Sequence, residues 1–128
     1  MDTKGILIVE DERIIALDLR YKLARLGYEV AGLAHSGAEA VRMARDARPA
    51  LVLMDIVLDD DMDGVEAARR IRLERDVPLL FVSACNDSPT RERALQIGCT
   101  RFVSKPVDPQ ELSKCIYEAL NGMPSGCG

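Results

Sequence analysis

The segment Leu51-Val-Leu-Met-Asp-Ile-Val57 is an apolar run interrupted by one carboxylate, Asp55. A continuous apolar run of this length is typical of a strand buried on both faces of a parallel sheet. Because an ionised carboxylate is costly to bury without a partner, we expect Asp55 to lie where the strand ends. In open α/β sheets, ligands bind at the carboxyl ends of the strands. The run therefore predicts both the fold class and the position of a site.

The rest of the chain alternates short apolar runs with segments of helical periodicity. Strands are predicted over residues 4–9, 28–33, 50–57, 78–83 and 100–104. Helices are predicted to begin near Asp11, Ser36, Asp63, Ser88 and Asp108, each next to an acid or a capping residue. This alternation predicts an α/β fold: a doubly wound five-stranded parallel sheet with the flavodoxin-like order 2-1-3-4-5 and five helices.

Length and charge limit the classes of protein. The 128 residues suit one domain, so we expect a single domain over 1–128, with an ordered core of about 4–122 and a frayed tail over 123–128. The net charge of −4 disfavours direct nucleic-acid binding. No signal peptide or membrane span is apparent, so we expect a cytoplasmic protein without membrane contact. A monomer or weak dimer is expected.

The cysteine and histidine residues do not predict a zinc site. The four cysteines show no C-x-x-C spacing, and His35 is the one histidine in the chain. We expect reduced, mostly buried thiols. We also expect His35 to lie at the surface, away from the carboxylates.

Polar side chains follow four of the five predicted strands: Glu10 and Asp11 the first, Asp55 the third, Ser83 the fourth and Lys105 the fifth. The carboxyl ends of parallel strands share one edge, so these side chains should meet there. Clustered carboxylates need positive charge, and hard oxygen ligands suit Mg²⁺. An Asp nucleophile with a metal, a lysine and a hydroxyl matches phosphoryl transfer.

The same residues belong to five short motifs that occur in a characteristic order along essentially the whole chain. Together they resemble the receiver domain of the response-regulator family of two-component signalling, of the single-domain chemotaxis type. The motifs are Val9-Glu10-Asp11, Leu53-Met54-Asp55-Ile56, Met62-Asp63-Gly64, Phe81-Val82-Ser83-Ala84 and Phe102-Val103-Ser104-Lys105-Pro106.

The resemblance implies a role for each site residue. Asp55 would be the phosphoacceptor; Glu10, Asp11, Asp55 and the Val57 carbonyl would hold Mg²⁺; Ser83 and Lys105 would bind the phosphoryl group; Phe102 would be an aromatic switch; and the Lys105-Pro106 bond would be cis. The implied partners are a histidine kinase or a histidine phosphotransfer protein as donor, and a downstream protein effector. The signal would leave through the face of the fourth helix, fifth strand and fifth helix.

The sequence departs from the common family pattern in one loop. The segment between Asp55 and Gly64 is one residue longer, and Asp59 stands where a proline is usual. The acids over 59–61 favour a solvated loop over a second metal site. Phe102 can also be read as plain core packing, because sequence does not distinguish a switch from a core aromatic.

We therefore interpret the chain as a phosphorylation-switched receiver that is not a turnover enzyme and only phosphorylates and dephosphorylates itself. One alternative is an aspartyl-phosphate phosphohydrolase, but such enzymes need a second acid where this chain has Val57. Another is a phosphorylation-independent interaction module, which the intact acid set and Lys105 disfavour. A third is a receiver taken from a hybrid histidine kinase or a longer regulator.

Overall fold

The structure is a computed structural model that describes residues 5–58, 62–83, 88–97 and 100–122. Five parallel strands form one sheet in the order β2-β1-β3-β4-β5, which confirms the predicted fold. The elements are β1 (Ile6–Val9), α1 (Arg13–Arg25), β2 (Val30–Ala34), α2 (Gly37–Ala47), β3 (Leu51–Asp55), α3 (Gly64–Glu74), β4 (Leu79–Ser83), α4 (Ser88–Leu95), β5 (Thr100–Ser104) and α5 (Pro109–Leu120).

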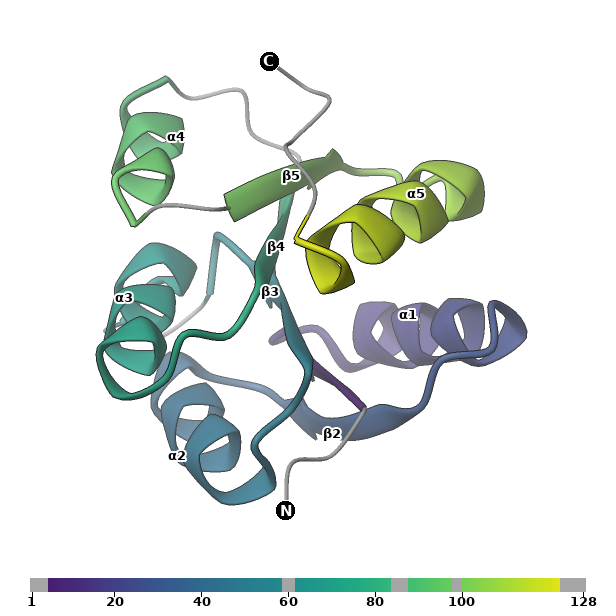
Figure 1. The fold of residues 1–128 in the computed structure, drawn as a ribbon, viewed down its shortest axis with the longest axis horizontal. Helices are drawn as coiled ribbons and strands as arrows, with labels where there is room; N and C mark the ends of the chain where they lie inside the picture. Colours follow the sequence, from purple (N-terminus) through teal and green to yellow (C-terminus); the bar gives the residue numbers. More distant parts are fainter. Residues whose placement is uncertain (1–4, 59–61, 84–87, 98–99, 123–128) are drawn as a thin grey trace.

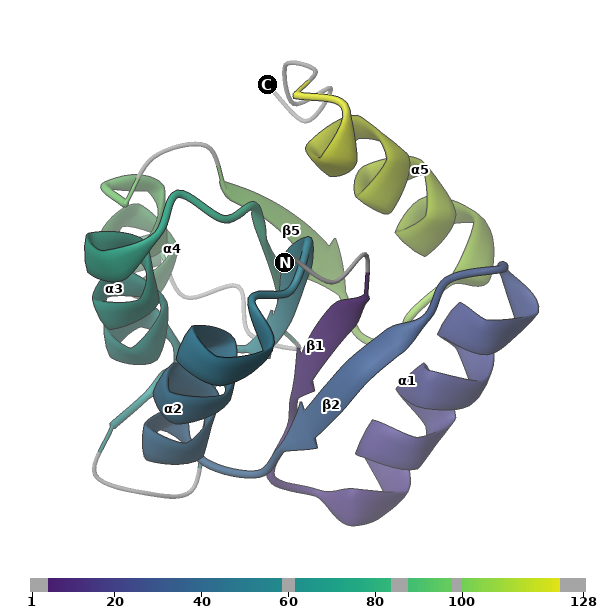
Figure 2. The same ribbon diagram turned by 60° about the horizontal axis from the view of Figure 1, so that its bottom comes forward.

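The helices cover both faces of the sheet. Helices α1 and α5 lie on one face, and α2, α3 and α4 lie on the other (Figures 1 and 2). Because successive strand residues point to opposite faces, each strand contributes to two cores. Leu53 and Leu80 pack on the α1–α5 side, whereas Met54 and Phe81 pack on the α2–α3 side. This double burial explains the continuous apolar runs of the sequence.

The predicted caps Ser36, Asp63 and Asp108 begin α2, α3 and α5. Helix α1 instead has Glu12 as its N-cap, without a side-chain cap hydrogen bond. Ser36 Oγ accepts a hydrogen bond from the Glu39 backbone N–H at 3.1 Å, as predicted. The Glu39 carboxylate, however, accepts from the backbone N–H of His35 at 2.7 Å, one residue before the cap. Asp108 caps α5 through the backbone N–H of Gln110 at 3.3 Å. Asp108 is therefore the N-cap of α5, as the sequence predicted.

The helix ends and strand limits shift slightly from the prediction. Gly27 follows α1 with φ +91°, a conformation that favours glycine, as expected of a C-terminal stop. β2 begins two residues later and ends one residue later than predicted, and β3 ends at Asp55 instead of Val57. The predicted frayed tail over 123–128 lies outside the described residues. No helix in the described ranges is long and apolar enough to cross a lipid bilayer.

Candidate functional site

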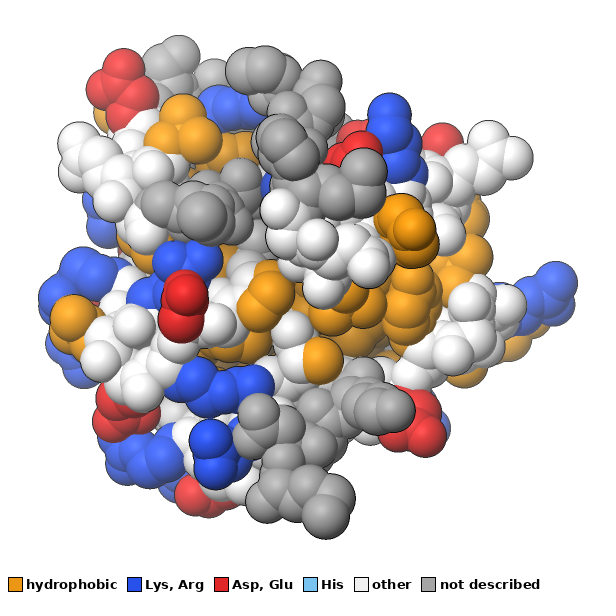
Figure 3. Space-filling model, viewed as in Figure 1, with side chains coloured by type: hydrophobic (Ala, Val, Ile, Leu, Met, Phe, Trp, Pro, Cys, Tyr) orange, Lys and Arg blue, Asp and Glu red, His pale blue; other side chains and the backbone are white. Residues whose placement is uncertain are grey.

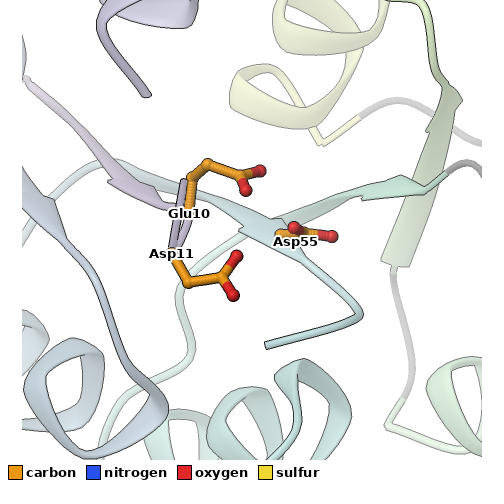
Figure 4. Close-up of side chains that lie close together, drawn as sticks. All are labelled: Glu10, Asp11 and Asp55. Atoms are coloured by element: carbon orange, nitrogen blue, oxygen red, sulfur yellow. The ribbon is translucent and has the colours of Figure 1, made fainter. Parts of the chain in front are cut away.

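Three carboxylates meet at the carboxyl edge of the sheet. β1 and β3 are adjacent and in register, with Val9 opposite Met54, so Glu10 and Asp11 leave β1 beside Asp55 at the end of β3. One oxygen from each of the three carboxylates lies within 4.8 Å of the others (Figure 4). Glu10 and Asp55 are buried and Asp11 is half-buried. The structure thus confirms the prediction that Glu10, Asp11 and Asp55 lie close together.

Lys105 supplies the positive charge beside this acidic cluster. Its Nζ lies 3.3 Å from Glu10 Oε2 and 3.3 Å from Asp55 Oδ2. Its backbone N–H donates to the Ser83 carbonyl at 3.0 Å, and the Lys105-Pro106 peptide bond is cis, as predicted. The lysine therefore reaches the acids from β5, across the end of β4.

The pKa values reflect the crowding of negative charge. Burial, followed by the hydrogen bond and the charge of Asp55, raises the pKa of Glu10 to about 7 against the lowering effects of the Glu12 backbone N–H and of Lys105. Burial by itself would lower the pKa of Lys105, but the charges of Asp55 and Glu10 outweigh it and raise that pKa above its ordinary value. Lys105 thus does not offset the combined effect of burial and of the Asp55 charge on Glu10.

Gly64 lets helix α3 begin directly against the phosphoacceptor candidate. A Cβ at this position would lie 2.1 Å from the Asp55 carbonyl oxygen and 2.8 Å from the Ile56 Cα. The Gly64 N–H also donates to the Ile56 carbonyl at 2.9 Å. The sequence drew attention to Gly64 only through its motif, whereas the structure gives the steric reason for a glycine.

His35 lies closer to the site than the sequence predicted. Its Nδ1 is 3.1 Å from the Glu10 carbonyl oxygen, and the residue is half-buried. The residue is therefore half-buried instead of at the surface, and its contact is to the main chain of Glu10 and not to the carboxylate. The difference arises at the C-terminal end of the second strand. Because β2 extends to Ala34, which pairs with Val9, His35 follows the strand directly beside Glu10.

The other predicted site residues that the structure describes are Ser83, Val57 and Phe102. Ser83 ends β4 and is buried, and Val57 is 65 % exposed with its N–H donating to Asp55 Oδ1 at 3.2 Å. The Phe102 ring stacks on Phe81 with centroids 5.7 Å apart, and the Arg91 guanidinium lies 4.6 Å above it. The acids over 59–61 lie outside the described residues.

Comparison with known proteins identifies the family of this chain. The family model of the response regulator receiver domain matches residues 6–117. The chain is 35 % identical over 118 residues to the transcriptional regulatory protein PdtaR of Mycobacterium tuberculosis, which covers 92 % of this chain and 57 % of that protein. The chain therefore spans little more than half the length of this curated relative.

Two solved structures match nearly the whole chain. The signal receiver domain of a modulated diguanylate cyclase from Desulfovibrio desulfuricans G20 is 40 % identical, with a TM-score of 0.88, over 94 % of this chain and 96 % of that one. A CheY-like receiver domain protein from Methanospirillum hungatei JF-1 is 29 % identical, with a TM-score of 0.86, over the same shares.

Proposed function

Because this chain belongs to the response regulator receiver family of two-component signalling, we propose that Asp55 accepts a phosphoryl group from a phosphohistidine donor. One observation carries the proposal: Lys105 Nζ lies 3.3 Å from both Asp55 and Glu10, with Asp11 completing the cluster. A nucleophilic carboxylate, further acids and a compact positive charge are the groups that phosphoryl transfer requires.

The carboxylate cluster fits Mg²⁺. Its donors are all hard oxygens, and the three carboxylates lie beside the one ammonium group of Lys105, which supports the proposal of a bound cation. Glu10, Asp11 and Asp55 would hold the ion, with the Val57 carbonyl added from the family resemblance. Bound there, Mg²⁺ would neutralise the carboxylates and the incoming phosphoryl oxygens.

The transfer step exchanges one bond to phosphorus for another. An Asp55 carboxylate oxygen forms the new bond as the bond from phosphorus to the donor imidazole nitrogen breaks, and its electron pair returns to the imidazole. Lys105, already beside Asp55, pairs with a phosphoryl oxygen. The Ser83 hydroxyl, at the end of the neighbouring strand, donates to another.

The product is an acyl phosphate that serves as a signal. Val57 stands two residues after Asp55, where a phosphohydrolase would carry a second acid, so we do not propose turnover of small substrates. The donor is a histidine kinase or a histidine phosphotransfer protein. The output surface is the face of α4, β5 and α5, where movement of Ser83 toward the phosphoryl group would be accompanied by a turn of Phe102.

Mass spectrometry after incubation with acetyl phosphate and Mg²⁺ tests the proposal. The wild-type chain should gain one phosphoryl group, Asp55→Asn should gain none, and Lys105→Ala should gain it more slowly. Glu92→Gln, which alters an exposed acid on α4, is the matched control and should label like wild type. Full labelling of the Asp55→Asn chain would refute the assignment.

A further inference from the structure

We propose that His35 is a positioning residue of the carboxylate site. Its ring fixes the peptide unit that joins Glu10 to Asp11, and thereby directs these two carboxylates toward a common divalent cation. The inference rests on the proposed function, because it takes Glu10 and Asp11 as ligands of Mg²⁺. It adds to that function a residue to which neither the strand-end pattern nor the family resemblance assigned a role.

The backbone changes direction between the two carboxylates. In an extended strand, successive side chains point to opposite faces of the sheet. β1, however, ends at Val9, and the chain bends at Asp11. The side chains of Glu10 and Asp11 both extend toward Asp55 (Figure 4). The two torsion angles that bring them to the same side lie on either side of the Glu10–Asp11 peptide unit.

His35 holds the carbonyl of this peptide unit. Its Nδ1 lies 3.1 Å from the Glu10 carbonyl oxygen. Glu10 is fully buried, and no backbone N–H in the described ranges donates to that oxygen. Because a peptide unit is planar, a bond that fixes the direction of the Glu10 carbonyl also fixes the Asp11 N–H. The His35 ring therefore limits both torsion angles that direct the carboxylates.

The contact also determines the tautomer of the His35 ring. A carbonyl oxygen can only accept a hydrogen bond, so Nδ1 must carry a proton. In the neutral ring, Nε2 is then the nitrogen without a proton. This assignment can be measured on the unmodified protein.

His35 is itself held in place by the elements on either side of it. Its backbone N–H donates to Glu39 Oε1 at 2.7 Å, and the Glu39 N–H donates to Ser36 Oγ at 3.1 Å, at the start of α2. The preceding residue, Ala34, ends β2, and its carbonyl accepts from the Glu10 N–H at 2.9 Å. The ring thus extends from a fixed backbone, as the support of a metal ligand requires.

Cation affinity, measured separately from stability, tests the proposal. The probe is Mn²⁺, which shares the preference of Mg²⁺ for carboxylate oxygens, with free Mn²⁺ measured by electron paramagnetic resonance. His35→Leu should bind Mn²⁺ at least about tenfold more weakly, as is usual when a group that orients a ligand is removed. His35→Asn should stay within about threefold of wild type, because its side-chain amide nitrogen, like Nδ1, is bonded to Cγ and can donate to the same carbonyl.

Arg72→Leu is the matched control. Arg72 Nε donates to the Val77 carbonyl at 2.8 Å, ahead of β4 and so at the opposite edge of the sheet from the carboxylates. Arg72 belongs to α3, on the side of the molecule where Lys and Arg side chains gather (Figure 3). Both leucine variants lose a bond to a backbone carbonyl and should lower the urea midpoint. Arg72→Leu should change Mn²⁺ affinity less than about twofold, because distant sites act independently.

A spectrum of the unmodified chain gives a second test. Proton–nitrogen correlation of the His35 ring at pH 8 should show the neutral ring protonated at Nδ1. Protonation at Nε2, equal losses of affinity in His35→Leu and His35→Asn, or an equal loss in Arg72→Leu would overturn the proposal. A wild-type chain that does not bind Mn²⁺ would overturn the metal site of the proposed function and this inference with it. Wild-type binding that His35→Leu retains in full would overturn the role of His35 alone.

Discussion

The metal-free protein should lose stability as the pH rises through the titration of Glu10. The ordinary pKa of this group is 4.5, and in the folded chain it is raised to about 7 by burial and by Asp55. Between these values the folded state holds the proton more tightly than the unfolded state. Stability from this group is therefore fully present below pH 4.5 and is lost as the pH rises to about 7.

The size of the effect follows from the interval between the two pKa values. At about 1.4 kcal/mol per pH unit, the rise from 4.5 to about 7 corresponds to an upper limit of about 3–4 kcal/mol. Asp11 and Lys105 are partly exposed, so water screens the cluster, and we expect a loss of about 1–3 kcal/mol. Glu10→Gln keeps the shape and removes the titration, so its stability should stay level over the same range.

Urea unfolding at several pH values, with a chelator present, measures this difference. Wild type should be less stable than Glu10→Gln at pH 8 and should approach it near pH 4.5. Adding Mg²⁺ should restore wild-type stability at pH 8, because the ion binds ionised carboxylates. Glu92→Gln, at an exposed position of α4, should follow the wild-type curve. Parallel curves for wild type and Glu10→Gln would refute the electrostatic account of the cluster.

Three further changes test other parts of the site. Asp11→Asn should lose most of the stabilisation by Mg²⁺, which for wild type is ~2.7 kcal/mol at a hundred times Kd; equal shifts in thermal melts of both proteins would remove Asp11 from the ligand set. Gly64→Ala should destabilise the fold by about 1–3 kcal/mol, because its Cβ would lie 2.1 Å from the Asp55 carbonyl oxygen; an unchanged urea midpoint would contradict this. Ser83→Ala should still be phosphorylated but show weaker amide shifts over 100–105 with a phosphoryl mimic bound, since it loses one charge-assisted hydrogen bond of ~1.5–3 kcal/mol; undiminished shifts would exclude Ser83 as the switch.

The sequence predicted the fold and the acidic cluster because both depend on local patterns. Apolar runs revealed the buried strands, and polar residues at their ends identified Glu10, Asp11, Asp55 and Lys105 as neighbours once β1 and β3 were placed side by side. Predicting the positions of these side chains did not depend on the conformation of any loop. The parallel topology alone brings strand ends to one edge.

Features that depend on contacts distant in sequence could not be predicted. The pairing of Arg93 with Asp63 joins residues 30 positions apart, and no periodicity reports it. The sequence did not predict the position of His35, because the predicted second strand ended one residue before Ala34, the last residue of β2. The metal, the roles of Ser83 and Phe102 and the partners remain predictions, because they concern states and molecules that the fold does not contain.

The backbone hydrogen bond from Lys105 to the Ser83 carbonyl has a consequence for how the site responds. Both residues are candidates to hold the phosphoryl group, and this bond of 3.0 Å ties the ends of β4 and β5 together. A displacement of Ser83 toward the phosphoryl group must therefore either carry the Lys105 backbone with it or break the bond. The two contacts are thus coupled, so we expect the response to be cooperative: intermediate positions of Ser83 would be poorly populated, and a receiver with this linkage would behave as an on–off element instead of a graded one.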